Sequence, residues 1–505
     1  MDEKPKNLWE YDDKYQSHVT ISTIDSTIES ENVDERIVYI EDLEKRRQVY
    51  GICGECKEPG TGEYWCQSCN AKRFKDNFKN WTSGNKHIDE FIQQSQLNAV
   101  HNEKCLEWIP FEKFQNVTYI AEGGFGKIYS AEWLEGNIEY WDIENQKWYR
   151  YSYKCALKSL NNSSDICSDF LNEIKSHLQI HLTDIVQCYG ITQDPNNKEY
   201  MMVLYYCSFG NLRDYLNKSK NYINYKSKID KLQQIARGLL DVHNSGKVHK
   251  DFHSGNILYN GVNNPYISDL GMCQPANIKQ PAKEEGIYGV LPYMAPEVLR
   301  GYQYTKAADI YSFGIIMNEF LFEEIPFNDI PHDEFLAIKI CMGLRPTISN
   351  DVPKLLTDLI IKCWDAEIEN RPTTKELYQI LTKWNDEIRK YSKGGEDYED
   401  GEYSEDAKDS ENGDNSQNSE IYSQIKECDK IRKERFKNRS NVDKSKSFQT
   451  HPQAFYTSRL LNFKNLPKPV NSSDLLSSFQ FSSDANYTAQ STSDPISECL
   501  DCLIK

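Results

Sequence analysis

The segment from Val248 to Leu258 constrains this chain more than any other part of its sequence. It reads Val-His-Lys-Asp-Phe-His-Ser-Gly-Asn-Ile-Leu, so Asp251 and Asn256 lie five residues apart, behind a histidine and ahead of an apolar pair. The segment falls within a region, from about residue 108 to 391, where apolar strand-like runs alternate with amphipathic helix-like runs. This alternation predicts a globular domain of mixed strand and helix around a polar loop.

A glycine-rich run lies upstream, between Ala121 and Gly126. Glycines let a backbone approach phosphate groups and supply N–H donors without side-chain collision. Such a run alone is a weak signal, because many hairpins carry one. After an aromatic hairpin, strand alternation in Cys-Ala-Leu-Lys places Ala156 and Lys158 on one face. Glu173 then opens an amphipathic helix, and taken singly both charged residues read as ordinary surface residues.

Further motifs follow in a fixed order. Residues 201–212 read as a buried strand, a turn and the start of a helix. Asp269 lies in Ser-Asp-Leu-Gly, Glu297 ends Tyr-Met-Ala-Pro-Glu, Asp309 begins Asp-Ile-Tyr-Ser-Phe-Gly, and Arg371 lies in Asn-Arg-Pro.

Together these motifs resemble those of protein kinases, with the tyrosine-kinase-like group as the nearest match. Residues 248–258 match the H-R-D-x-x-x-x-N loop, and the glycine run matches G-x-G-x-x-G with Ala121 in the first glycine position. The resemblance implies an α+β, bilobal kinase fold, with a small β-rich N-lobe and a larger helical C-lobe. It also implies transfer of the ATP γ-phosphoryl group to protein hydroxyls.

The resemblance also implies a role for each matching residue. Asp251 would accept the proton of the acceptor hydroxyl, Asn256 and Asp269 would hold magnesium, and Arg371 would pair with Glu297. Leu204 would be the gatekeeper residue. The nucleotide-contacting set would be Ala121, Gly123, Gly124, Gly126, Ile128, Ala156, Lys158, Glu173, Leu204, Tyr205, Cys207 and Leu258.

Besides Ala121, four further positions depart from the family pattern. Lys250 replaces the Arg that commonly reads an activation-loop phosphate through a bidentate fork, which Lys cannot reproduce. His253 replaces a Lys, Val290 replaces a Thr, and Leu270 replaces the Phe of Asp-Phe-Gly. Residues 272–294 contain no Ser or Thr, and their hydroxyls are those of Tyr288 and Tyr293. We therefore expect activity that does not depend on Ser/Thr phosphorylation of this segment. Ser/Thr specificity is the preferred interpretation, with Tyr or dual specificity open.

A second chemical module precedes the kinase-like region. Cys53, Cys56, Cys66 and Cys69 form two C-x2-C pairs separated by nine residues. Thiolates are soft ligands, and two such pairs can close a tetrahedral zinc site. A redox pair is the alternative, but two pairs favour structural zinc. So small a module lacks a core of its own, so the metal should supply its folding energy.

The residues that follow the cysteines mix basic and aromatic side chains, which could bind nucleic acid, although packing of the aromatics is the preferred interpretation. These residues are Lys72, Arg73, Phe74, Lys75, Phe78, Lys79 and Trp81.

The whole chain divides into five predicted parts. Its hydrophobic share of 38% is low for a wholly globular chain, and its formal charge of −18 argues against nonspecific nucleic-acid binding. We expect a mostly flexible arm (1–47), a zinc module (48–85), a connecting helix (86–108), a kinase domain (109–391) and a disordered acidic, basic and Ser-rich tail (392–505).

Location and partners follow from the same features. The chain has no secretory signal or membrane-length apolar run, and its 15 cysteines read mainly as reduced thiols, so a cytoplasmic or nuclear protein is expected. ATP and a protein substrate are the expected partners, with a further protein partner for the cysteine module or tail. An ATP-binding scaffold of weak or no activity remains the alternative, as does a chain whose main function is the cysteine module. Cys502-Leu-Ile-Lys fits a prenylation box poorly.

Overall fold

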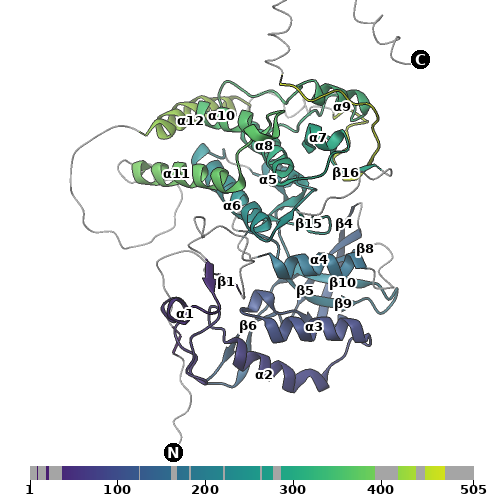
Figure 1. Ribbon diagram of the computed structural model, residues 1–505, viewed down its shortest axis with the longest axis vertical. Coiled ribbons are helices and arrows are strands. Elements are labelled where there is room, and N and C mark those ends of the chain that lie inside the picture. The colour runs from purple at the N-terminus through teal and green to yellow at the C-terminus, as the bar shows by residue number, and fades with distance from the viewer. Residues whose placement is uncertain are drawn as a thin grey trace, which may run out of the picture.

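The computed structural model describes most of the 505-residue chain (Figure 1). The described residues are 8–9, 19–21, 37–123, 126–160, 168–180, 184–219, 222–261, 264–276, 286–392, 419–439 and 450–471. Of the helices in these ranges, none combines the length and apolar character needed to cross a membrane.

The smaller lobe is built on a six-stranded sheet in the order β3-β9-β10-β8-β5-β4. Side chains alternate along its strands, so Met202 and Leu204 enter one apolar cluster while Met201 and Val203 enter another on the opposite face. The strands are β3 (Glu107–Trp108), β4 (Phe114–Gly123), β5 (Gly126–Trp133), β8 (Lys154–Leu160), β9 (Cys188–Gln193) and β10 (Tyr200–Tyr205).

Two helices cover one face of this sheet. Helix α4 (Ser168–Gln179) contributes Phe170 and Ile174 to the cluster that contains Met202, and α3 (Lys86–Asn98) contributes Ile88 and Ile92. Helix α3 lies within the predicted connecting helix, residues 86–108. It forms a wall of the lobe, and β3 joins the six-stranded sheet before residue 109, so the predicted boundary at 108/109 falls inside one packed unit.

The aromatic hairpin joins the N-terminal region to the lobe. It consists of β6 (Asn137–Asp142) and β7 (Lys147–Tyr151). Trp148 stacks on Phe74 with ring centroids 4.9 Å apart and on Trp65 at 5.8 Å. Helix α2 (Gln67–Asn77) carries Phe74, so the cysteine region is packed on the hairpin. Arg73 also lies over the Trp141 ring, which supports packing of the basic and aromatic residues.

The predicted arm and cysteine module are also continuous. Strand β1 (Val19–Ile21) pairs in parallel with β2 (Ile37–Tyr39), and α1 (Leu43–Tyr50) spans the boundary predicted at residue 48. Buried Arg46 of α1 donates to the carbonyls of Gly60, Ile40 and Pro59 at 2.8, 2.7 and 2.6 Å. The described end of the arm, from residue 37, is therefore folded onto the module.

Lys104 links this N-terminal region to α4. Its ammonium is buried and donates to the carbonyls of Ile180 and, at 3.4 Å, His177 at the C-terminal end of that helix. Burial lowers the pKa of Lys104 to about 7, against the opposing charge of Glu103.

The larger lobe is helical and holds the largest apolar cluster. Helix α8 (Lys306–Phe322) is buried from Ala308 to Leu321, as expected for a helix that is apolar all round. A Cβ on its Gly314 would lie 2.8 Å from Cβ of Cys363, so glycine permits close packing on α10. The other helices are α5 (Leu212–Lys218), α6 (Tyr225–Asn244), α7 (Pro296–Leu299), α9 (Glu334–Cys341), α10 (Lys354–Cys363) and α11 (Thr374–Ser392).

Short strands and turns shape the junction between the lobes. Strands β11, β13 and β14 form one small sheet, and β12 pairs with β15. These strands are β11 (Gly210–Asn211), β12 (Lys247–Val248), β13 (Ile257–Tyr259), β14 (Pro265–Ile267) and β15 (Gln274–Pro275). Elsewhere and at the junction, the described chain forms 3-10 turns at Phe78–Asn80, Asn102–Lys104, Phe111–Lys113, Ser254–Asn256, Leu291–Tyr293 and Ile368–Asn370. The mixed architecture confirms the α+β, bilobal prediction.

The C-terminal region departs from the predicted disordered tail. Helix α12 (Glu420–Arg439) packs against α11 and α6, and β17 (Arg459–Leu461) pairs with β16 (Ile287–Gly289) (Figure 1). Buried Ile421, Ile425, Leu461 and Leu466 join the large-lobe cluster. Average composition missed these segments because their few apolar residues bury against a neighbouring domain. The rest of the predicted tail lies outside the described residues.

Candidate functional site

A buried ion-pair group links three elements at the junction of the lobes. Nζ of Lys158, on β8, lies 2.7 Å from Oε1 of Glu173 on α4 and 2.9 Å from Oδ1 of Asp269, which follows β14. The Lys158 and Glu173 side chains are 7% and 2% exposed. A Cβ on Gly271 would lie 3.0 Å from Oε2 of Glu173, so the glycine after Leu270 allows this approach.

The opposite charges in this group stabilise one another's ionised forms. Burial lowers the pKa of Lys158, but Asp269 and Glu173 outweigh burial and raise it overall. Burial likewise raises the pKa of Asp269, but the Lys158 charge lowers it below its usual range. The pKa of Glu173 is raised, first by burial, while Lys158 opposes the rise. The group therefore holds an ammonium and an Asp269 carboxylate in a site largely closed to water.

The loop that carries Asp251 is held from below by Asp309 at the start of α8. The Asp309 carboxylate accepts from the backbone N–H of His249 at 2.7 Å and of Lys250 at 3.1 Å, and it lies 2.9 Å from Nε2 of His243. Lys250 and Asp269 have φ of 70° and 59°, a left-handed conformation that is uncommon for residues other than glycine. Buried hydrogen bonds to Asp309 stabilise that conformation at Lys250.

Asp251 and Asn256 lie together as their spacing predicts. Nδ2 of Asn256 donates to the backbone carbonyl of Asp251 at 2.9 Å, and the two side chains approach at 3.4 Å. Burial raises the pKa of Asp251, but the charge and hydrogen bond of His253 and the hydroxyl of Ser458 outweigh it and lower the pKa to about 2. Asp251 is therefore a carboxylate throughout the neutral range.

The predicted nucleotide-contacting residues converge on the same junction. Ile128 pairs with both Ala121 and Lys158 across the sheet, and Ala156 pairs with Leu204. The backbone N–H of Tyr205 donates to the carbonyl of Gln187 at 2.9 Å. Gly123 and Gly126 pair at the tip of the β4–β5 hairpin, and Gly124 lies outside the described residues. Leu204 and Cys207 share one apolar cluster, against which Ala156, Tyr205 and Leu258 pack.

The predicted pair between Arg371 and Glu297 is bidentate and buried. Nη1 and Nη2 of Arg371 lie 2.6 and 2.8 Å from Oε1 and Oε2 of Glu297. This ion pair anchors the start of α7 beside the segment that ends at Tyr-Met-Ala-Pro-Glu.

The departures from the family pattern have definite surroundings. Nζ of Lys250 donates to Oε1 of Gln274 at 2.9 Å and lies over the Tyr304 ring. Nε2 of His253 lies 3.5 Å from Oδ2 of Asp251. Val290 is buried in the large-lobe cluster.

The sequence did not indicate two features of this site. The tail places Ser458 against Asp251, with its Oγ 2.6 Å from Oδ1 and 2.5 Å from Oδ2. Arg213 binds Oε1 of Glu319 at 2.9 Å and the hydroxyl of Tyr293 at 2.7 Å, beneath the loop. The only sequence signal for the first feature is the higher apolar content of residues 454–470 relative to the polar residues around them.

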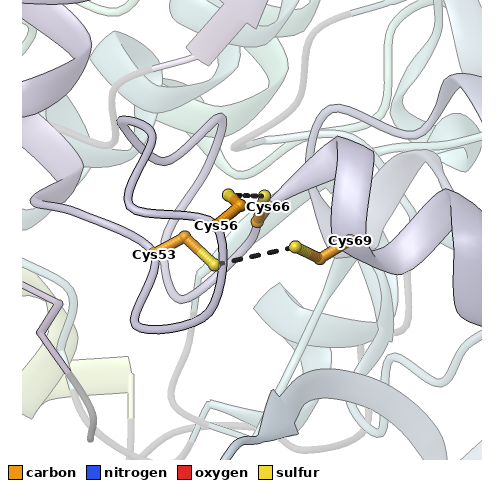
Figure 2. A group of neighbouring side chains, drawn as sticks. All are labelled: Cys53, Cys56, Cys66 and Cys69. Atoms are coloured by element: carbon orange, nitrogen blue, oxygen red, sulfur yellow. Dashed lines mark hydrogen bonds between the residues drawn. The ribbon is translucent and has the colours of Figure 1, made fainter. Parts of the chain in front are cut away.

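The four cysteines form a compact cluster (Figure 2). Their sulfur atoms all lie within 4.8 Å of one another, with Sγ separations of 3.9 Å for Cys53 and Cys69 and 3.6 Å for Cys56 and Cys66. Cys66 is the N-cap of α2, and its hydrogen bond with Cys53, followed by burial, raises the pKa of its thiol. In the described part of the chain the cysteines are free thiols.

Comparison with known proteins defines the class of this fold and site. Residues 114–381 match the family described as protein tyrosine and serine/threonine kinase. The chain belongs to this protein kinase family. The match confirms the resemblance drawn from the motifs, and the tyrosine-kinase-like grouping agrees with a family that spans both tyrosine and serine/threonine kinases.

Individual relatives carry serine/threonine kinase names. The chain is 29% identical over 279 residues to the serine/threonine-protein kinase VIK of Arabidopsis thaliana, which spans 54% of this chain and 60% of that protein. It is 27% identical over 292 residues to the probable serine/threonine-protein kinase gdt4 of Dictyostelium discoideum, 56% of this chain and 16% of that protein. A serine/threonine-protein kinase/receptor of Acanthamoeba polyphaga mimivirus is 36% identical over 279 residues, 55% of this chain and 16% of that protein. The matches thus span less than two thirds of these relatives' lengths.

Proposed function

We propose that this protein transfers the γ-phosphoryl group of ATP to hydroxyl groups of proteins, with Ser and Thr as the preferred acceptors. The observation that carries the proposal is the arrangement of Lys158, Glu173, Asp251, Asn256 and Asp269 at one junction, with Lys158 bound to two carboxylates. Phosphoryl transfer of this kind depends on positioning and charge neutralisation, which buried and charged side chains provide.

Each residue has a distinct role in this proposal. Lys158 binds the α- and β-phosphates, and Glu173 holds its ammonium in place. Asp251 orients the acceptor hydroxyl and takes its proton. Leu204, Ala156 and Leu258 form an apolar wall for the adenine. Because the N–H of Tyr205 donates to the carbonyl of Gln187, the backbone group of Tyr205 that binds the adenine base is its carbonyl.

The residues present also suit magnesium. Mg²⁺ prefers oxygen ligands, and Asp269 supplies a carboxylate. The amide nitrogen of Asn256 donates to the Asp251 carbonyl, so the amide oxygen of Asn256 is the atom that would bind a cation. Bound magnesium would neutralise charge on the phosphates, while Asn256 and Asp269 hold it beside Lys158.

Two observations support Ser and Thr as acceptors. The relatives named above are serine/threonine kinases by name. A serine hydroxyl also reaches Asp251 at 2.5 Å, so a short side chain fits between the substrate backbone and this carboxylate.

We further propose that the cysteine cluster holds a structural zinc ion. Four thiolates about 2.3 Å from Zn²⁺ would lie about 3.8 Å apart, close to the observed separations of 3.6 and 3.9 Å. Burial, followed by the charges of Cys53 and Cys56, raises the pKa of Cys69 to about 12, so a bound cation is needed to keep the four sulfurs ionised together.

Reduced thiols elsewhere in the chain support a cytoplasmic location.

A radiolabelled γ-phosphate transfer assay tests the enzyme proposal. Asp251→Asn should lower labelling of a general protein substrate by about 100-fold or more, because the variant removes the proton acceptor. Asp358→Asn is the matched control, since Asp358 forms an exposed i,i+4 pair with Lys354 on α10, and it should retain full activity. Equal labelling by wild type and Asp251→Asn would favour the ATP-binding scaffold instead. Phosphoamino-acid analysis of the product distinguishes Ser and Thr from Tyr.

A further inference from the structure

A segment of the C-terminal region lies across the candidate active site. Strand β17 pairs antiparallel with β16, with Leu461 opposite Ile287, Leu460 opposite Tyr288 and Arg459 opposite Gly289. Strand β16 lies in the segment between Asp269 and Glu297, which borders the Asp251 loop. Backbone pairing of an extended peptide with a sheet edge is a common way for a protein to hold a peptide ligand.

This pairing places one hydroxyl at Asp251. Oγ of Ser458 donates to the Asp251 carboxylate at 2.5 to 2.6 Å and lies 3.5 Å from Nε2 of His253. The preceding Thr457 is exposed, at a bend just before β17. Ser458 is therefore the hydroxyl that this backbone register presents to the carboxylate.

The residues before Ser458 bind a polar surface of the large lobe. The Tyr456 ring lies 4.0 Å from the Arg213 guanidinium and 4.8 Å from the His332 ring, and its hydroxyl donates to the Pro326 carbonyl at 2.8 Å. Backbone hydrogen bonds continue this contact upstream, from His332 N–H to the Gln453 carbonyl at 2.9 Å and from His451 N–H to the Asn328 carbonyl at 2.8 Å.

The residues after Ser458 bind an apolar surface and then a second polar one. Leu461 and Leu466 are buried in the large-lobe cluster. The N–H of Val470 donates to the carbonyl of Cys341 at 3.0 Å, and the Asn471 side chain accepts from the N–H of Ala366 at 2.9 Å. The segment is thus held on both sides of Ser458, which fixes the position of that hydroxyl.

We propose that residues 450–471 are a substrate segment built into this chain, and that Ser458 is its site of autophosphorylation in cis. The inference rests on the proposed kinase activity, with ATP as the donor. The Ser458 oxygen forms a bond to the γ-phosphorus as the bond from that phosphorus to the β,γ-bridging oxygen breaks. The bridging oxygen keeps the electron pair and leaves with ADP, and the Ser458 proton passes to Asp251.

The phosphorylated segment should dissociate from the site around Asp251. Phosphate on Ser458 would carry close to two negative charges beside the ionised Asp251, and the repulsion disfavours the docked state. Before transfer the segment blocks protein substrates from Asp251, and after transfer its dissociation exposes Asp251 to them. Helix α12 is docked on the same lobe and ends at Arg439, and the described segment begins at residue 450, so the segment is presented at high effective concentration.

The test uses the full chain with labelled ATP and maps phosphorylated residues by mass spectrometry. Ser458 should be the principal site, with a rate constant that stays the same over a 100-fold range of protein concentration. Ser458→Ala should remove this label, whereas Thr457→Ala, which alters the exposed neighbouring hydroxyl, should keep it. A rate constant that rises with protein concentration would overturn transfer in cis.

A second pair of variants tests the docking itself. Leu461→Asp places a charge in the apolar cluster and should slow Ser458 labelling about tenfold, whereas Leu460→Asp, at a side chain that is 52% exposed, should change it less than twofold. Equal rates in the two variants would contradict the docked arrangement.

Adding a separate protein substrate distinguishes failure of Ser458 autophosphorylation from failure of the proposed kinase activity. If that substrate is phosphorylated and Ser458 is not, the inference fails while the proposed function stands. If neither is phosphorylated, the proposed function fails and the inference fails with it.

Discussion

The two ends of the chain are attached to the kinase domain by different kinds of contact. The N-terminal region packs aromatic rings on the β6–β7 hairpin, where Phe74 and Trp65 stack on Trp148, and it has a four-thiol cluster within it. The C-terminal region relies more on charged and polar groups. Arg432 of α12 donates to the Tyr225 hydroxyl at 3.2 Å and to the carbonyls of Leu321 and Phe322, and Asp429 accepts from the Tyr222 hydroxyl at 2.7 Å.

This difference indicates which of the two attachments, the N-terminal or the C-terminal one, can be reversed. The contacts made by stacked aromatic rings and by the four-thiol cluster depend little on the charge of nearby groups. A docked segment whose serine hydroxyl lies against an aspartate responds directly to a new charge on that serine. The N-terminal region therefore acts as a fixed part of the small lobe, and the C-terminal segment as a removable cover of the large lobe.

Metal removal should produce the largest contrast between the two regions. Chelation of the full chain should lower the amide-exchange protection of α2 at least tenfold and leave α12 unchanged, because a small four-cysteine module gains its folding free energy from the metal. Hydrogen exchange with mass spectrometry measures both helices in one sample.

Cysteine variants control this experiment. Cys66→Ser should lose stoichiometric zinc, whereas Cys105→Ser, at a buried free thiol outside the cluster, should retain it. Full zinc content in Cys66→Ser, or its absence from the wild type, would remove the basis for a metal-held N-terminal region.

Arg432→Ala should loosen the C-terminal attachment by about 2 kcal/mol, because it removes the charged donor from the Phe322 carbonyl and leaves the Leu321 carbonyl with its 3.2 Å bond from Nζ of Lys228. The measurement is amide exchange in α12, with α2 as an internal reference. Arg435→Ala is the matched control, since Arg435 binds Asp351 at 2.8 Å but its side chain is 59% exposed, so less than about 1 kcal/mol should be lost. Equal effects of the two variants would mean that α12 is held mainly by its apolar face.

A pH effect at Lys228, beneath α12, should be the smallest. Burial lowers the pKa of Lys228 to about 8 from its ordinary 10.5, although Glu323 opposes the shift. The unfolded chain therefore binds this proton more tightly. The stability cost is fully present below pH 8 and is relieved as pH rises from 8 toward 10.5.

The comparison variant is Lys228→Met. The free energy of unfolding of the wild type should gain about 1–2 kcal/mol relative to this variant between pH 7.5 and 9.5. Urea unfolding at the two pH values measures this difference. The same pH dependence in both proteins would show that Lys228 is not the titrating group.

The sequence predicted the parts of the site that depend on motif order. Asp269 lies 111 residues after Lys158, yet the motifs identified Lys158, Glu173 and Asp269 together because a known fold relates those motifs in space. The thiol cluster followed from local spacing alone. Ser458 could not be predicted in this way, because it meets Asp251 across 207 residues and no motif marks the contact. Its segment folds on an existing surface, so its own composition resembles that of an unfolded chain.

The contact made by Lys104 has a practical consequence for any shortened form of this protein. Helix α4 carries Glu173, and the negative end of its dipole is met by an ammonium that lies before the first residue of the family match. A chain cut at residue 109 would lose this amino group, which is partly charged near pH 7, and would remove α3 from the apolar cluster that it shares with Phe170 and Ile174 of α4. The smallest piece that keeps the Lys158–Glu173 pair in position therefore begins upstream of the domain that sequence comparison delimits.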